Sequence, residues 1–422
     1  MVQTREIDPV EDLLLFADPR SPLAWLRRGD GMVGLGTVAG YEPGVTLPDR
    51  VWQDSAAQMW RSIAADAEIE DPVRLHGTGL VAFGAFAFDA RSRSSNRLIV
   101  PQAVIGRRDG RAWITRIRSI ADPVGHPEPA CVPVPYGPYW SATLGPGALD
   151  PAGYQAAVRA GLDAIASSEV GKVVLARDLV GTVPASADLR RLVRALSTGY
   201  PDTWTFAVDG LIGASPETLV TVSGGSVTAR VLAGTFPRGA DADDDAAASF
   251  ALEHSGKDLE EHRYAVQSVL DALAPHASAL RADDEPFTLE LPNLWHLATD
   301  VAGELADHAS ALDLVASLHP TAAVAGTPTD AAIEAIRRIE PFDRGRYAGP
   351  VGWVDANGDG EWAIALRCAQ IGSVPGPGYG SAASDTLPVV AHAGAGIVAG
   401  SDPETELLET RVKFRPIVDA LA

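Results

Sequence analysis

The chain has little cysteine, no long apolar run and no excess of positive charge. Its two cysteines, Cys131 and Cys368, are too few and too far apart for a disulfide framework or a cysteine-based zinc site. No apolar run approaches the length that spans a bilayer, and the N-terminus has no basic stretch followed by an apolar one. We therefore expect a cytoplasmic protein with reduced thiols and no membrane partner.

Acidic residues outnumber basic ones, 55 to 34, which gives a formal net charge of −21. Nucleic acids and anionic membranes bind basic surfaces, so neither is expected as a partner. An acidic protein that binds an anionic substrate has to gather cations locally, from lysine, arginine, a metal ion or backbone N–H groups. Basic residues that stand among apolar ones are therefore the first candidates for a site.

The residues that are present, 46% apolar and 21% charged, are typical of a soluble globular protein. Residues 1–150 are rich in glycine, proline and short β-like runs, and a proline-dense connection lies at 121–138. Strands and helices mix over 151–422 without the regular βαβ alternation of a parallel sheet. We expect an α+β fold with a β-rich N-terminal portion over 1–150 and the functional site in 151–422.

Local signals predict the elements of the second portion. Asp150 is a predicted cap, and Pro151 is the first residue of a helix. The acidic stretch 238–249 is predicted to be a loop. Further helices are predicted over about 247–275, 329–339 and 403–421. The predicted strands are 172–180, 204–208, 211–213, 218–222, 227–232 and 387–398.

Lys172 stands at the head of a predicted strand, on the same face as Val174 and Ala176. If that face is buried, desolvation favours the neutral amine, which can act as a general base. If the face is exposed, Lys172 is a solvated strand start. Glu217 lies in a tight turn between two apolar strands, where burial would keep it protonated as an acid. An ordinary turn glutamate is the alternative.

Two predicted helices carry acidic residues at helical spacing. Asp258 and Glu261 are three positions apart in "KDLEEH", and Glu406, Glu409 and Lys413 share one face of the last helix. An exposed stripe of salt bridges, worth a few tenths of a kcal/mol, is the alternative. Two carboxylate pairs on separate helices would also suit one octahedral Mg²⁺.

Arg367 lies in "EWAIALRCAQ", where alternation places it on one strand face with Ala363 and Ala365. These small neighbours leave room for a ligand carboxylate, which the guanidinium can bind with two hydrogen bonds. A sheet-edge arginine is the alternative.

Taken together, these segments resemble the chorismate-utilising enzymes, and most closely the isochorismate synthases. The resemblance covers about 150–422 and is loose over the first 150 residues, from which no site is transferred. It runs through "KVVLAR", "GASPETL", "LAGT", "KDLEEH", "LWHLAT", "LHPTAAVAG", "EPFDRGRYAGPVGW", "GEWAIALRCAQI" and "GAGIVAGSDPETELLETRVK".

The resemblance implies one large α+β domain in which two sheets pack face to face, with Mg²⁺ in the cleft and chorismate as the substrate. Residues 151–422 would then be the chorismate-binding catalytic region of a monomeric isomerase with no obligate protein partner. Lys172 resembles the base that activates water, and Glu217 the acid that protonates the departing hydroxyl.

The remaining site residues are implied by the same motifs. Glu261 and Glu409 match direct Mg²⁺ ligands, while Asp258 and Glu406 match positions that act through water. Backbone N–H groups around Gly394 are also expected to bind a carboxylate. The other expected substrate-binding residues are Arg367, Lys413, Gly234, Thr235, Ala323, Tyr347 and His296.

Lys172 disfavours the relatives that install nitrogen, the anthranilate and aminodeoxychorismate synthases, which resemble this chain in other motifs but lack a water-activating lysine. Salicylate synthases keep the lysine and go on to eliminate pyruvate. Because Thr235 and Tyr347 differ from some isochorismate synthases, onward elimination stays open at this point. The resemblance also leaves open whether the product feeds menaquinone or siderophore synthesis.

Overall fold

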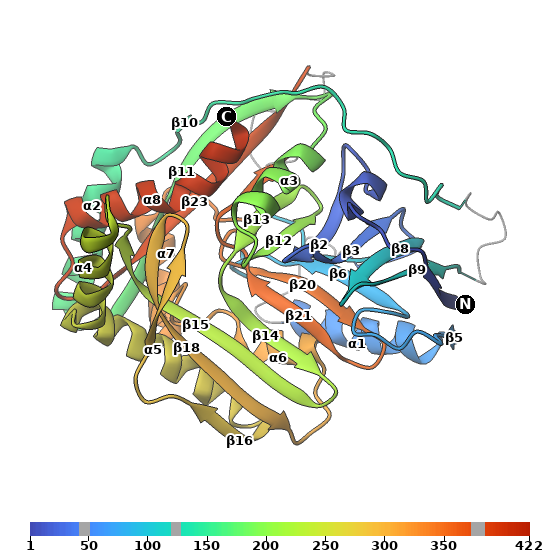
Figure 1. Ribbon diagram of the computed structural model, residues 1–422. Coiled ribbons are helices and arrows are strands. Elements are labelled where there is room, and N and C mark those ends of the chain that lie inside the picture. The colour runs from blue at the N-terminus through green and yellow to red at the C-terminus, as the bar shows by residue number, and fades with distance from the viewer. Residues whose placement is uncertain (42–50, 120–127, 373–384) are drawn as a thin grey trace.

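The computed structural model describes residues 1–41, 51–119, 128–372 and 385–422. Two large sheets form the centre of the molecule, and helices cover their outer faces and ends (Figure 1). The expected α+β fold with a two-sheet core is confirmed. No helix in the described part of the chain is long and apolar enough to cross a membrane.

The first sheet combines strands from both ends of the chain. β19 (Gly326–Thr327) pairs with β11 at one end of this sheet. In spatial order the other strands are β10 (Gly145–Pro146), β11 (Lys172–Pro184), β23 (Thr386–Ile397), β22 (Cys368–Ile371), β13 (Leu211–Ser215), β12 (Trp204–Val208), β2 (Leu23–Arg27), β3 (Asp30–Leu35), β8 (Ala103–Arg108), β9 (Arg111–Ile117), β1 (Val2–Ile7) and β5 (Ile69–Glu70).

The second sheet also takes strands from both portions. β17 (Phe287–Leu291) pairs with β18 (Leu294–Leu305) but is not one of the strands in the continuous order across the sheet. That order is β16 (Ala277–Ala282), β18 (Leu294–Leu305), β15 (Ser226–Pro237), β14 (Thr218–Ser223), β21 (Gly360–Ile364), β20 (Pro350–Asp355), β6 (Val81–Ala85), β7 (Arg97–Val100) and β4 (Ala39–Tyr41).

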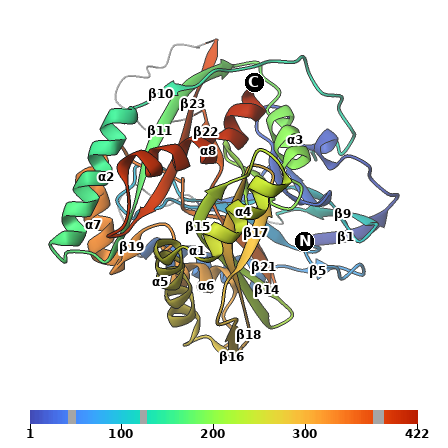
Figure 2. The same ribbon diagram turned by 60° about the vertical axis from the view of Figure 1, so that its left-hand side comes forward.

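The helices fall into groups around the two sheets. Helices α2 (Pro151–Ala166), α7 (Thr329–Ile339) and α8 (Pro403–Leu421) pack around the long strands β11 and β23 (Figure 2). On the second sheet, α4 (Ala242–Glu253) and α5 (Gly256–Leu273) lie near β15 and β18, whereas α6 (Ala311–Leu318) packs on β14, β20 and β21. The other helices of the described residues are η1 (Leu13–Phe16, a 3₁₀ turn), α1 (Val51–Ala65) and α3 (Arg190–Gly199).

Alternation along β2 shows why the first sheet is buried on both faces. Leu23 and Trp25 point into the core between the sheets, whereas Ala24 and Leu26 belong to a second apolar cluster with residues of η1, α3 and α8. The inter-sheet core contains side chains from both sheets, including the fully buried Trp353. The two sheets therefore share one hydrophobic core.

The prediction for 238–275 is wrong in two respects. The acidic stretch is helical in α4, because the Asp241 side chain accepts hydrogen bonds from two N–H groups of the first turn, whose own acidic residues favour a helix N-terminus. The expected single long helix is broken after α4. Ser255 is extended and caps α5 by accepting from the Asp258 N–H, so the break separates two capped helices.

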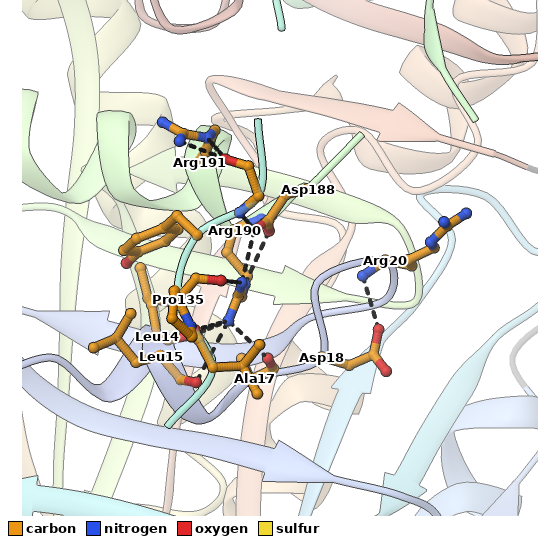
Figure 3. A network of polar contacts seen from close by, with 12 residues as sticks. Leu14, Leu15, Ala17, Asp18, Arg20, Pro135, Asp188, Arg190 and Arg191 are labelled. Carbon is orange, nitrogen blue, oxygen red and sulfur yellow. Dashed lines mark hydrogen bonds and ion pairs between the residues drawn. The ribbon is translucent and has the colours of Figure 1, made fainter. Parts of the chain in front are cut away.

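The proline-rich connection is described from residue 128 onward, since 120–127 lie outside the described residues. A buried arginine, Arg190, holds it in place (Figure 3). Its Nη2 donates to the Pro135 carbonyl at 3.0 Å and to Oδ2 of Asp188 at 2.7 Å. Its Nη1 donates to carbonyls of η1, including that of Leu14 at 3.4 Å. The N-terminal segment, the connection and α3 therefore meet at one guanidinium.

Candidate active site

A cavity lies between β11, β15, β23 and the segments that carry Glu217 and Arg367. It brings together most of the predicted site residues, and Lys172, Asp258, Glu406 and Glu409 are not among its lining residues. The predicted residues that line it are Glu217, Gly234, Thr235, Glu261, His296, Ala323, Tyr347, Arg367, Gly394 and Lys413.

Lys172 lies directly behind this lining. It is the first residue of β11, its side chain is 0% exposed, and Nζ lies 3.3 Å from Oε1 of Glu261. Nζ has no hydrogen-bond partner within the described residues. Gly396 on β23 makes room for this pair, because a Cβ there would overlap Oε1 of Glu261 and lie 2.9 Å from Cε of Lys172. The amine is therefore buried against the wall of the cavity.

Glu217 lies in the turn between β13 and β14, and its side chain is buried. The turn is anchored to β21, since the Ser215 hydroxyl donates to the Ile364 carbonyl at 2.6 Å and the Ile364 N–H donates to the Glu217 carbonyl at 3.2 Å. Burial raises the pKa of Glu217 to about 8, against the opposing charges of Lys172 and Arg367. At neutral pH this carboxyl group holds a proton.

Arg367 does not lie on a strand face, so the alternation prediction is wrong. β21 ends at Ile364, and Arg367 adopts φ 49° in the kink before β22. The left-handed residue turns its buried side chain towards β18, where Nη2 donates to Nε2 of His296 at 2.9 Å. Periodicity could not predict this orientation, because a single left-handed residue interrupts the two-residue repeat.

His296 connects Arg367 to the bulge in β15. Its Nδ1 lies 3.0 Å from the Gly234 carbonyl and 3.1 Å from Oγ1 of Thr235. Burial and the Arg367 charge hold the pKa of His296 well below its usual value. Gly234 has φ 79° where the pairing register shifts, and a Cβ there would lie 3.0 Å from Cβ of Asp258. Glycine is required at this close approach.

The four predicted metal-facing carboxylates lie on two helices, Asp258 and Glu261 on α5 and Glu406 and Glu409 on α8. Burial and the Glu409 charge raise the pKa of Glu406 to about 7. Burial also raises the pKa of Asp258, with Glu261 and Glu409 adding to the increase. Oε2 of Glu406 is buried and has no hydrogen-bond partner within the described residues. These acidic groups are thus close enough to repel one another.

Lysines compensate part of this negative charge. Nζ of Lys257 lies 2.6 Å from Oε1 of Glu406, and Lys413 pairs with Glu409 while donating to the Gly394 carbonyl at 3.0 Å. No group of three or more His, Cys, Asp or Glu side chains in the described ranges is arranged to hold a metal ion by itself. A metal bound here would therefore replace ammonium groups as the partner of the carboxylates.

Comparison with known proteins shows which family the chain belongs to. A family model described as "Chorismate binding enzyme" matches residues 141–422. Isochorismate synthase DhbC of Bacillus subtilis is 40% identical over 284 residues, which cover 64% of this chain and 68% of the relative. The chain belongs to the chorismate-binding enzyme family. All the predicted site residues of this chorismate-binding enzyme fall within the matched range.

Two longer alignments extend the likeness over the N-terminal portion. A relative named MenF, from Mycobacterium tuberculosis, is 36% identical over 359 residues, 82% of this chain and 87% of the relative. The crystal structure of DhbC from Bacillus anthracis has a TM-score of 0.76 and 30% sequence identity, covering 97% of this chain and 98% of that chain. The predicted resemblance to the isochorismate synthases is confirmed.

Sequence reasoning missed several residues that support the wall of this cavity. Arg344 and Glu340 form a buried ion pair at 2.6 Å. Arg344 Nη2 donates to the Val174 carbonyl at 2.7 Å, and Oε1 of Glu340 accepts from the Ala176 N–H at 2.8 Å. This pair therefore fixes the backbone of β11 at positions two and four residues beyond Lys172. The presence of an acid and a base four residues apart was the available signal, but it does not predict which strand they bind.

Lys257 and Gly396 were also missed. Lys257 immediately precedes Asp258 in "KDLEEH", and Gly396 lies within the glycine-rich strand β23. Tyr347 was predicted and is buried in the cavity wall, where its ring stacks on His392 with centroids 5.2 Å apart. The contacts of all three depend on segments distant in sequence.

Proposed function

We propose that this protein is an isochorismate synthase. Water adds to the ring carbon beside the one that bears the carboxylate of chorismate, and the hydroxyl across the ring leaves. The observation that carries the proposal is that a buried protonated carboxyl, Glu217, lines a cavity of a chorismate-binding enzyme, and that a buried amine, Lys172, lies directly behind Glu261 in the wall of the same cavity.

Glu217 is proposed as the general acid. Its carboxyl group lines the cavity, and the pKa of about 8 leaves it protonated at neutral pH. It can therefore donate a proton to the departing hydroxyl, which would otherwise leave as hydroxide. Arg367 and Lys413 lower this pKa only in part, so the cationic wall does not prevent the acid from holding its proton.

Lys172 is proposed as the general base. Its Nζ is buried and has no hydrogen-bond partner in the described structure, so no protein group would compete for its lone pair once the proton is removed, and that lone pair could accept a proton from water. Glu261 is its nearby charged partner, at 3.3 Å. The Arg344–Glu340 pair fixes the strand that carries Lys172, which keeps the base in position relative to the cavity.

Arg367 and Lys413 are proposed to bind the carboxylates of chorismate. Both line the cavity, and Arg367 is held by His296 with most of its guanidinium hydrogens left for a ligand. Gly234, Thr235, Ala323, Tyr347 and Gly394 complete the wall around the ring. A dianion would therefore meet cations in the wall of the cavity, although the chain as a whole is acidic.

Mg²⁺ is proposed as the cofactor, held by Glu261 and Glu409 with Asp258 and Glu406 behind them. The donor set fits, because all four groups are carboxylates and a buried oxygen of Glu406 lacks a partner among the described residues. When bound, the ion would draw electron density from the ring carboxylate and fix the ring in the cavity. Mg²⁺ and a dianionic substrate carry equal and opposite charges, so binding both would leave the net charge of the site unchanged.

The test is incubation of the purified chain with chorismate and Mg²⁺, followed by chromatographic separation of products. Isochorismate is expected from the chain alone, without a partner protein. Salicylate with pyruvate would favour a salicylate synthase, and product formed only with ammonia would favour an aminating relative. Unchanged chorismate under all conditions would overturn the proposal, provided that circular dichroism shows folded protein. Lys172→Ala should remove turnover and leave the fold intact.

A further inference from the structure

The chain contains three lysines and 31 arginines. All three lysines lie at the site, and each pairs with a different carboxylate of the acidic set. The pairs are Lys172 with Glu261 at 3.3 Å, Lys257 with Glu406 at 2.6 Å, and Lys413 with Glu409. Arginine or histidine supplies the cation in the other described ion pairs. Lysine is therefore confined to positions that face the proposed metal ligands.

Lys257 differs from the other two because it does not line the cavity and has no assigned role in the reaction. It lies on α5, in the turn before Glu261, and its side chain reaches across to Glu406 on α8. The Glu406 side chain is 0% exposed, whereas that of Lys257 is 24% exposed. The Lys257 side chain is therefore partly open to solvent, whereas the carboxylate that its ammonium contacts is fully buried.

Besides Lys257, the Ser401 hydroxyl interacts with the Glu406 carboxylate, but Oε2 of Glu406 makes no hydrogen bond of ordinary geometry within the described residues. A buried carboxylate is costly unless it is paired, and the lysine supplies that pairing when no metal is present. A divalent cation among the same carboxylates would repel an ammonium at this position. The two cations therefore compete for Glu406.

We propose that Lys257 is an internal counter-ion, which neutralises Glu406 in the metal-free enzyme and releases that carboxylate when Mg²⁺ binds. The inference rests on the proposed function, because it assumes a metal ion at the acidic set. Lysine suits this exchange because its ammonium is a point charge on a flexible stem. Arginine would hold the carboxylate with two parallel hydrogen bonds and would leave less readily.

The first experiment measures Mg²⁺ affinity by isothermal titration calorimetry at fixed pH. Lys257→Met should bind Mg²⁺ about tenfold more tightly than the wild type, because the competing charge is gone. Lys257→Arg is the matched control and should bind Mg²⁺ no more tightly than the wild type. Equal or weaker binding by a folded Lys257→Met protein would overturn the proposal. In EDTA, the melting temperature of Lys257→Met should also be lower than that of the wild type. Saturating Mg²⁺ should reduce this difference in melting temperature.

The second experiment uses the rarity of lysine directly. Brief acetylation with an N-hydroxysuccinimide ester, followed by peptide mass spectrometry, reports on three ε-amines and the N-terminal amine. Mg²⁺ should raise modification of Lys257 about twofold or more, while the N-terminal amine, which is remote from the site, stays constant as the internal control. Modification of Lys257 that stays unchanged or falls on addition of Mg²⁺ would contradict release.

The two experiments separate this inference from the function on which it rests. If the wild type neither binds Mg²⁺ nor converts chorismate, the proposed function and the counter-ion both fail. If the wild type binds Mg²⁺ and converts chorismate, but neither the affinity of Lys257→Met nor the labelling of Lys257 responds as expected, only the counter-ion is overturned.

Discussion

Nη2 of Arg367 donates a hydrogen bond to Nε2 of His296 across 2.9 Å. A guanidinium has no acceptor, so Nε2 accepts, and the ring carries its proton on Nδ1 towards the Gly234 carbonyl at 3.0 Å. The low pKa of His296, caused by burial and by Arg367, agrees with this neutral tautomer. A neutral histidine thus orients the cation that is proposed to bind a substrate carboxylate.

Replacing His296 with phenylalanine should raise KM for chorismate about tenfold or more and change kcat less, because Arg367 loses the acceptor that orients it. A hydrogen bond to a charged group contributes about 1.5–3 kcal/mol, which corresponds to such a change. His296→Gln is the control, because its amide oxygen can accept a hydrogen bond from Arg367. The KM of this variant should stay close to the wild-type value. Steady-state kinetics separates the two parameters. A loss confined to kcat would show that His296 acts in the chemical step instead.

Activity should depend on the protonation of Glu217. Burial raises its pKa to about 8, so the acid is protonated below that pH and loses its proton above it. We expect kcat to fall as the pH rises through about 8, measured at saturating chorismate and Mg²⁺ between pH 6.5 and 9.5. Glu217→Gln, which cannot donate the proton, should have a low kcat across this pH range, without the fall near pH 8. A wild-type profile that stays flat through pH 9 would argue against Glu217 as the acid.

The same carboxyl group should lower stability at alkaline pH. Its folded-state pKa of about 8 lies above the ordinary value of 4.5, so its contribution to stability is fully present below pH 4.5 and is lost as the pH rises towards 8. Glu217→Gln should therefore exceed the wild type in unfolding free energy at pH 8.5, by on the order of a few kcal/mol, and by less at pH 5. Urea denaturation at both pH values measures this.

Glu68→Gln, at an exposed position, is the control for that comparison and should show no pH-dependent gain. If Glu217→Gln is no more stable than the wild type at pH 8.5, ionising the Glu217 carboxyl group does not cost the folded protein the free energy that its burial predicts.

Gly396→Ala should strongly reduce turnover. The added Cβ would overlap Oε1 of Glu261 and lie 2.9 Å from Cε of Lys172, so the ion pair at the base would have to separate. We expect kcat/KM to fall by about a hundredfold, a loss typical of a misplaced catalytic group. Gly400→Ala is the control, because its Cβ would meet Cγ of Lys257 at an ordinary 3.9 Å. Comparable activity of the two variants would show that the pair tolerates displacement.

Removing divalent metal with EDTA should abolish turnover, and added MgCl₂ should restore it. The physical reason is that carboxylates on α5 and α8 are buried close together: burial raises the pKa values of Glu406 and Asp258, and repulsion from neighbouring carboxylates raises them further. Glu409→Gln should need more Mg²⁺ for half-maximal activity, since one proposed ligand is lost. Thermal unfolding gives an independent readout, because Mg²⁺ that binds the folded state raises the melting temperature. Full activity in EDTA would exclude a required metal.

Much of the local structure could be predicted because its causes are local. Asp150 accepts from the Gly153 N–H and opens α2, and α8 begins at Pro403 behind the Asp402 cap, as the sequence predicts. The helix break at Ser255 was missed, although its capping serine was visible. Helical propensity on both sides of Ser255 masked the single hydrogen bond, from the Asp258 N–H to the Ser255 hydroxyl, that caps the start of α5.

The sequence by itself determined which chemical groups the site can use and which of them share a helix face or a strand. It also carried the ordered motifs that identify the family. Only the tertiary structure decided that Lys172 and Glu217 are buried at one cavity, because burial depends on strands such as β11 and β23, which pair across some 200 residues. Desolvation and charge pairing arise from this packing, and they give an ordinary lysine and an ordinary glutamate the environment that acid–base chemistry requires.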